Sequence, residues 1–175
     1  MNIIAWLKYS DEKELSIEED YRIQKLASVI YHMIFRQGCN IQQFDLIIPL
    51  DVTYIDFPRF SIFTTHKPGI TNLKSLHMHI NLNLFKYKNT IEFLNMTPKF
   101  CSNIQIFESN GEFIDPFLGV IKLQPLKKLT LNHEYLEKDG IKKLLHALKH
   151  RSETLKELFF DSFDFQNIDL SFISA

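Results

Sequence analysis

Two pairs of histidines have a spacing that could do chemistry. His77 and His79 are two residues apart, so in a strand both imidazoles would point to one face and could bind a metal beside a third ligand. His146 and His150 are four apart and would share a helix face, but no glutamate follows His146 as in the zinc-binding His-Glu-x-x-His motif. Both pairs are more typical of a solvated surface, and we predict neither a metal nor a cofactor.

Other catalytic patterns give equally little support for an enzyme. Asp161 and Asp164 could form a carboxylate pair, but the sequence places no partner acid and no cleft beside them. The five glycines, at 38, 69, 111, 119 and 140, make no phosphate-binding loop. A Gly-x-Ser-x-Gly nucleophile elbow and a cysteine protease signature are also missing from the sequence. We therefore expect no catalytic residues.

The composition favours one globular domain, or part of one, in the cell interior. The chain has 175 residues, of which 45% are hydrophobic and 13% aromatic, so it can bury a core. The formal net charge is -1, and no block of basic residues is present, so no nucleic-acid binding is predicted. The densest basic group, at 138–151, lies near Glu134, Glu137, Asp139 and Glu153, which predicts a solvated helix face. The sequence contains no run of 18 apolar residues, so no membrane helix is predicted, and the N-terminus makes a poor signal peptide. We expect an intracellular protein, in cytoplasm or nucleus, with Cys39 and Cys101 reduced, although one disulfide between them stays open.

The elements that would position any site are set by a recurring pattern. It reads apolar, two residues, apolar, one residue, apolar, and its clearest copies span 73–78, 126–131 and 155–160, with weaker copies at 41–46 and 101–106. The copies begin at 41, 73, 101, 126 and 155, so they are 32, 28, 25 and 29 residues apart. Leucine-rich repeats run to about 20–29 residues, so these units lie at or beyond the long end.

The last two apolar positions of each copy share one face of a short strand, which must be buried by stacking on its neighbours. Parallel strands need crossovers. Apolar residues at helical spacing predict helices in these crossovers at 90–97, 114–123 and 136–150. The first helix is expected to end at Pro98 and the second to start at Asp115. A capping box at Ser16 predicts an N-terminal helix within 10–38, whereas 50–72 predicts a loop with a short strand at 60–64. The sequence thus predicts an α/β leucine-rich repeat solenoid with irregular repeats of about 25–32 residues.

We expect a single domain over 1–175, with repeats over 39–175. The apolar segment at 161–175 resembles the start of a further unit, which indicates part of a longer array. The strand residues that point away from the core would line one concave surface. They are either tolerated polar residues or a protein-binding face, and Phe107 and Phe159 among polar neighbours are typical of an interface. Mixed charge predicts no strong preference for an acidic or a basic partner. The candidates are Gln43, Asp45, Ser75, His77, His79, Asn103, Gln105, Phe107, Lys128, Thr130, Asn132, Glu157, Phe159 and Asp161.

Three segments carry a family resemblance: CNIQQF at 39–44, ITNLKSL at 70–76 and SETLKEL at 152–158. Over 26–173 the chain resembles the irregular leucine-rich repeat regions of fungal F-box proteins, above all the expanded sets of mycorrhizal fungi. The resemblance implies the substrate-recognition part of an SCF-type ubiquitin ligase subunit, acting in ubiquitin-dependent protein degradation. The first 40 residues show no F-box, so adaptor and cullin partners are expected only if an F-box is supplied elsewhere. The alternative is a scaffold repeat protein, or a truncated gene copy, unconnected to ubiquitin; the target protein stays unidentified.

Overall fold

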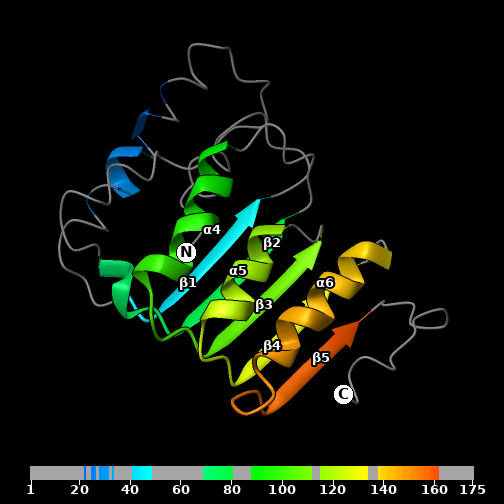
Figure 1. Cartoon of the computed structure of the whole chain (residues 1–175). Helices are drawn as coiled ribbons and strands as arrows, with labels where there is room; N and C mark the ends of the chain where they lie inside the picture. The colour runs from blue at the N-terminus through cyan, green and yellow to red at the C-terminus, as the bar shows by residue number, and fades with distance from the viewer. Residues whose placement is uncertain are drawn as a thin grey trace.

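The computed structural model describes residues 41–48, 69–80, 88–111, 115–133 and 138–161, together with scattered helical positions between 22 and 33. Five strands form one parallel sheet in the order β1-β2-β3-β4-β5, the same as their order in the chain (Figure 1). The strands are β1 Gln43–Ile48, β2 Ser75–Ile80, β3 Ile106–Gly111, β4 Lys128–Asn132 and β5 Glu157–Asp161. Beyond the helical positions between 22 and 33, the helices in the described ranges are α4 Lys88–Phe100, α5 Asp115–Leu123 and α6 Lys138–Lys149, with a 3-10 turn, η1, at Gly69–Asn72.

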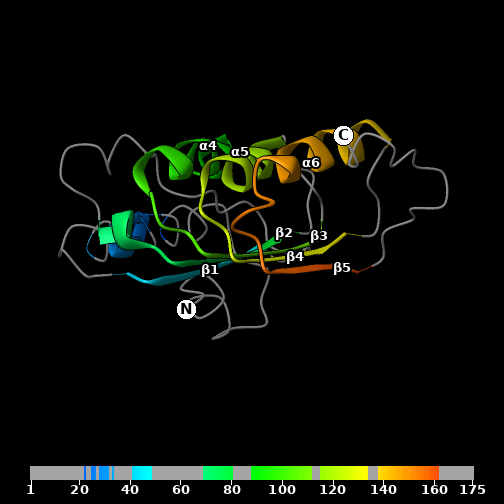
Figure 2. The ribbon, with the colours of Figure 1, turned by 60° about the horizontal axis from the view of Figure 1, so that its bottom comes forward.

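The three helices lie on the same face of the sheet, and each connects two neighbouring parallel strands (Figure 2). This arrangement confirms the predicted α/β class and the alternation of parallel strands with helices. Helix α5 begins at Asp115, as its Asp-Pro start predicts. Helix α4 runs two residues past Pro98, where the helix was expected to end. A proline in the last turn removes only one backbone donor, so the helix continues to Phe100.

The same hydrogen-bond arrangement recurs just before strands β2 to β5. Each time, two successive backbone N–H groups donate to one carbonyl oxygen of the preceding strand segment, as Lys74 and Ser75 do to Gln42. The accepting residues are Gln42, Lys74, Gln105 and Lys127. Because the accepting residue lies at the same position before each strand, the strands keep one register, and the side chains of all five strands form continuous rows across the sheet.

Two of those rows and the helices make the core. Leu76, Phe107 and Leu129 are fully buried in one row, and Met78, Ser109 and Leu131 are buried in the next. The rings of Phe107 and Phe117 meet edge-on, with their centroids 5.3 Å apart. Helix residues close the core from above, among them Phe93, Leu94, Phe117, Val120, Ile121 and Leu144.

The third unit departs from the sequence prediction by three residues. The repeat pattern predicts this unit at 101–106. The buried residues equivalent to Leu126, Leu129 and Leu131 of the next unit are instead Ile104, Phe107 and Ser109. The all-apolar match was wrong because the core position after Phe107 holds a serine, which the pattern did not allow. With this correction the units begin 32, 31, 22 and 29 residues apart. Cys101 is buried instead in the loop before the strand, where its thiol donates to the Ile70 carbonyl at 3.1 Å.

Gln124 joins the parts of this third unit. Its side-chain amide, which is almost fully buried, donates to the carbonyls of Pro98 at 3.1 Å and Cys101 at 2.7 Å, while its oxygen accepts from the Ile104 amide at 3.2 Å. One side chain thus satisfies backbone groups at the end of α4 and in the loop that leads into β3. Buried backbone groups need such partners, so we assign Gln124 a structural role.

Several predictions fall outside the described residues: the strand at 60–64, the cap at Ser16, the end of the N-terminal helix at Gly38, Cys39, Asp164 and the segment 162–175. The described positions between 22 and 33 are helical. Within the described part of the chain, no helix is both long and apolar enough to span a bilayer.

Candidate functional site

The sheet face opposite the helices presents three rows of side chains, each crossing all five strands. We call these residues the open face. They are Gln43, Ser75, Ile106, Lys128 and Glu157 in the first row, Asp45, His77, Glu108, Thr130 and Phe159 in the second, and Ile47, His79, Asn110, Asn132 and Asp161 in the third. Side chains in a row are about 4.8 Å apart from strand to strand, so neighbours can interact directly.

Most of the predicted concave residues lie on the open face, and three do not. Phe107 is wrong as a surface residue, because it is 0% exposed and packs in the core. Asn103 and Gln105 precede β3 and pair with each other, the Gln105 amide donating to the Asn103 oxygen at 3.0 Å. All three errors follow from the misplaced third unit. The same error hid Glu108, although alternation outward from a buried Phe107 would have indicated it.

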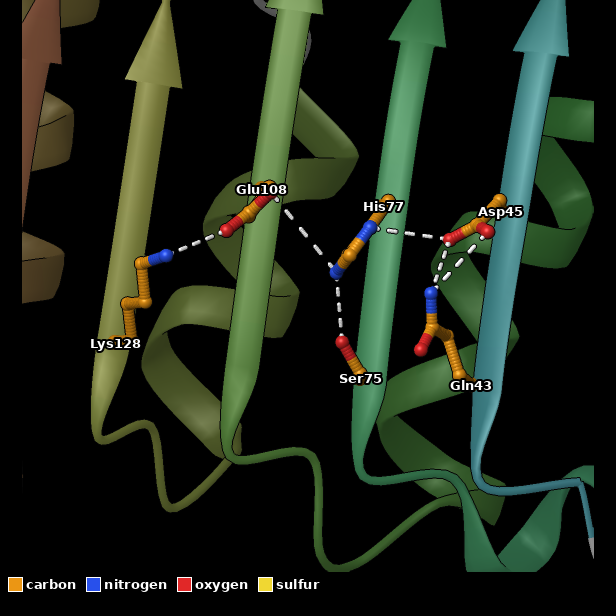
Figure 3. A network of polar contacts seen from close by, with 6 residues as sticks. All are labelled: Gln43, Asp45, Ser75, His77, Glu108 and Lys128. Atoms are coloured by element: carbon orange, nitrogen blue, oxygen red, sulfur yellow. Dashed lines mark hydrogen bonds and ion pairs between the residues drawn. The ribbon is translucent and has the colours of Figure 1, made fainter.

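A polar network joins four strands of the open face (Figure 3). His77 on β2 has Nδ1 3.1 Å from the carboxylate of Asp45 on β1 and Nε2 2.7 Å from the Ser75 hydroxyl on its own strand. Gln43 donates to both Asp45 oxygens at 3.2 Å. These contacts favour the tautomer with a proton on Nδ1, facing Asp45, which leaves Nε2 to accept from Ser75.

Glu108 and Lys128 extend the network. The Lys128 ammonium donates to one Glu108 oxygen at 2.8 Å, and the other oxygen is 4.0 Å from His77 Nε2. The hydrogen bond and the charge of Glu108, helped by Glu157, raise the pKa of Lys128 above its usual value. Lys128 also lies 5.9 Å from the ring centre of Phe159, within cation–π range. The polar network therefore spans β1 to β4, and the contact of Lys128 with the Phe159 ring extends it to β5.

The chain from Ser75 through His77 to Asp45 has the connectivity of a nucleophile, a base and an orienting carboxylate. Acyl transfer also needs donors aimed at the developing oxyanion, which supply much of the rate enhancement. The backbone N–H of Ser75 already donates to the Gln42 carbonyl, and β2 is hydrogen-bonded to strands on both sides. In the described residues, this geometry orders the polar surface of the open face.

Neither histidine pair gathers a metal-ligand set in the described residues. His77 and His79 share the open face, as predicted, and the rings of His146 and His150 on α6 have centroids 5.2 Å apart. No group of three or more His, Cys, Asp or Glu side chains able to hold a metal occurs in the described ranges.

Large apolar side chains are exposed near both edges of the open face. Phe159 on β5 is 54% exposed and Ile47 on β1 is 46% exposed. The prediction of an exposed aromatic at Phe159 is confirmed. Comparison with protein-family models, with curated proteins and with solved structures gave no match to this chain.

Proposed function

We propose that this chain is a protein-interaction module that holds a partner protein on its open face. The observation that carries the proposal is the contrast between the two sides of the sheet. Helices α4, α5 and α6 cover one side (Figure 2), whereas the other carries the polar network (Figure 3) and the exposed side chains of Phe159 and Ile47. Aromatic residues set among hydrogen-bonding groups are enriched at binding interfaces. The proposal assigns no reaction to the chain, which would act inside the cell.

The dimensions of the open face suit a segment of a partner. The outer strands of a five-stranded sheet are about 19 Å apart, and strands of five or six residues are about 17–20 Å long. That area is smaller than the roughly 800 Å² per partner that a standard interface buries. A short segment lying across the strands, aided by contacts at the rim, fits this surface better than a broad protein face.

A finer proposal concerns the assembly. The resemblance to the repeats of fungal F-box proteins supports a role as the target-holding part of a ubiquitin ligase subunit, with the F-box supplied outside this chain. The strand and helix alternation is compatible with such a leucine-rich repeat arrangement. The alternative is a scaffold that holds partners with no link to ubiquitin.

Affinity purification with quantitative mass spectrometry tests the proposal. Wild-type chain is compared with Phe159→Ala on the open face and with Leu123→Ala on α5, a matched control because Leu123 is also an exposed large apolar residue, at 57%. We expect partners to be lost with Phe159→Ala and kept with Leu123→Ala, since a hot-spot aromatic contributes about 2 kcal/mol, or roughly thirtyfold in Kd. Partners that depend on Leu123 and ignore Phe159 would overturn the open-face proposal.

The same experiment on the full gene product separates the two assemblies. Recovery of adaptor and cullin subunits together with a target supports the ligase role. Recovery of open-face partners with no adaptor or cullin leaves the scaffold role.

A further inference from the structure

Among the described residues, the open face and the three helices α4, α5 and α6 differ in the sign of their charge. The open face carries four carboxylates and one lysine, a net charge of -3 with neutral histidines. The carboxylates belong to Asp45, Glu108, Glu157 and Asp161, and the lysine is Lys128. The sequence alone predicted a face with no strong charge preference, partly because its residue set held Phe107 where the structure places Glu108.

The helices carry the opposite charge. Helices α4, α5 and α6 contain seven lysines and three acidic residues, a net charge of +4. The whole chain has a net charge of only -1, so the excess of carboxylates is a property of the open face and not of the composition. A face of one sign on a nearly neutral protein orients an oppositely charged partner toward that face during encounter.

The apolar residues define a second requirement on the partner. Phe159 lies in the second row, with Glu157 and Asp161 on either side of it on the outward face of β5, and Lys128 near its ring. An entirely charged segment would leave this exposed ring without an apolar contact. The second row crosses the sheet from Asp45 to Phe159 over about 19 Å, the length of roughly six residues of extended chain.

We propose that the open face binds a basic segment of the partner protein, about six residues long, that also carries a large apolar side chain for Phe159. This inference rests on the proposed function and specifies the chemistry of the partner. Lysine or arginine side chains of the segment pair with the carboxylates of the open face, and its apolar side chain packs on the Phe159 ring. Because the carboxylates are largely exposed or half-exposed, the pairing is weakened by salt.

Selection from a phage-displayed library of random 12-residue peptides tests the inference without a known partner. The immobilised wild-type chain should enrich peptides with a positive net charge and at least one large apolar residue. The most enriched peptide is then synthesised, and its Kd is measured by fluorescence anisotropy at low and high salt. We expect Phe159→Ala to weaken binding, and added salt to weaken it further.

A pair of charge-matched double variants gives the decisive comparison. Glu157→Gln with Asp161→Asn removes two negative charges from the open face, while Glu92→Gln with Asp139→Asn removes two from the helices. Two exposed ion pairs correspond to about a two- to thirtyfold change in Kd, which we expect for the open-face double variant alone. Equal effects of the two double variants, or no effect of either, would refute pairing at the open face.

Each remaining outcome identifies which proposal has failed. Neutral or acidic peptides whose binding depends on Phe159 would overturn the basic-segment inference and leave the open face as the binding surface. Enriched peptides that bind Phe159→Ala and the open-face double variant as well as wild type would overturn the proposed function itself, as would a library that yields no peptide above background.

Discussion

Replacing Phe107 with alanine should lower the free energy of unfolding by about 3–5 kcal/mol, the usual cost of removing a fully buried aromatic side chain. Phe107 has no exposed surface, its neighbours in the row are Leu76 and Leu129, and its ring meets Phe117 edge-on. The ring contact alone accounts for roughly 0.5–1.5 kcal/mol of this cost, and the rest comes from lost burial and the cavity left behind.

Ile106→Ala makes the prediction discriminating. Ile106 is half-buried on the open face, so its replacement should cost about 1 kcal/mol or less. If β3 were aligned as the repeat pattern first suggested, Ile106 would face the core, and Ile106→Ala would be the costly change, at about 2–5 kcal/mol. The order of the two variants therefore reports which residues of β3 point inward.

Urea unfolding followed by far-UV circular dichroism measures both variants, and thermal scans check them. For a chain of this length, 1 kcal/mol corresponds to about 2–4 °C in Tm, so Phe107→Ala should lower Tm by about 6–20 °C. If Phe107→Ala does not fold, Phe107→Leu should still fold with a loss of roughly 1–2 kcal/mol. The register of β3 would be refuted if Phe107→Ala lowered the free energy of unfolding by less than about 1 kcal/mol, or if Ile106→Ala lowered it by more than Phe107→Ala does.

Three further predictions concern buried polar groups. Gln124→Met should lower the free energy of unfolding in urea by about 2–4 kcal/mol, because it leaves backbone groups of the third unit unsatisfied. The control Gln105→Met, near the surface, should lower it by under about 0.5 kcal/mol. Similar losses for both variants would contradict the role of Gln124. Burial holds the pKa of His133 below its usual value, despite the hydrogen bond with the Gly111 carbonyl, so protons bind the unfolded chain more readily. The free energy of unfolding should therefore fall as pH drops below about 6.5, the pKa of histidine in the unfolded chain, and it should fall less steeply in His133→Gln. An equally steep fall in both proteins would count against His133 as the cause. Burial raises the pKa of the Cys101 thiol to about 12. In a Cys39→Ser variant at pH 8, the Cys101 thiol should therefore react with a disulfide reagent slowly in the native protein and quickly in urea. Rapid labelling of the native protein would contradict the burial of Cys101.

Local patterns were enough to predict most elements of the fold. Strands β2, β4 and β5 fall within the copies at 73–78, 126–131 and 155–160 or run a few residues past them, because two-residue alternation is written in the local sequence. Helix α6 lies within the predicted 136–150, since its apolar stripe is equally local. The third strand failed because Ser109 occupies a core position, and burial of a serine next to Phe107 depends on how neighbouring strands and α5 pack.

The sequence by itself determined the class of the fold, the alternation of strands with helices, and most residues of the open face. Tertiary structure alone decided which of those residues are neighbours. Asp45, His77 and Glu108 come from three separate strands, and they meet only because the backbone hydrogen bonds before each strand hold the strands level. A shift of one residue would turn each outward side chain toward the helices, so lateral register, a long-range property, determines both the polar network and the charge of the open face.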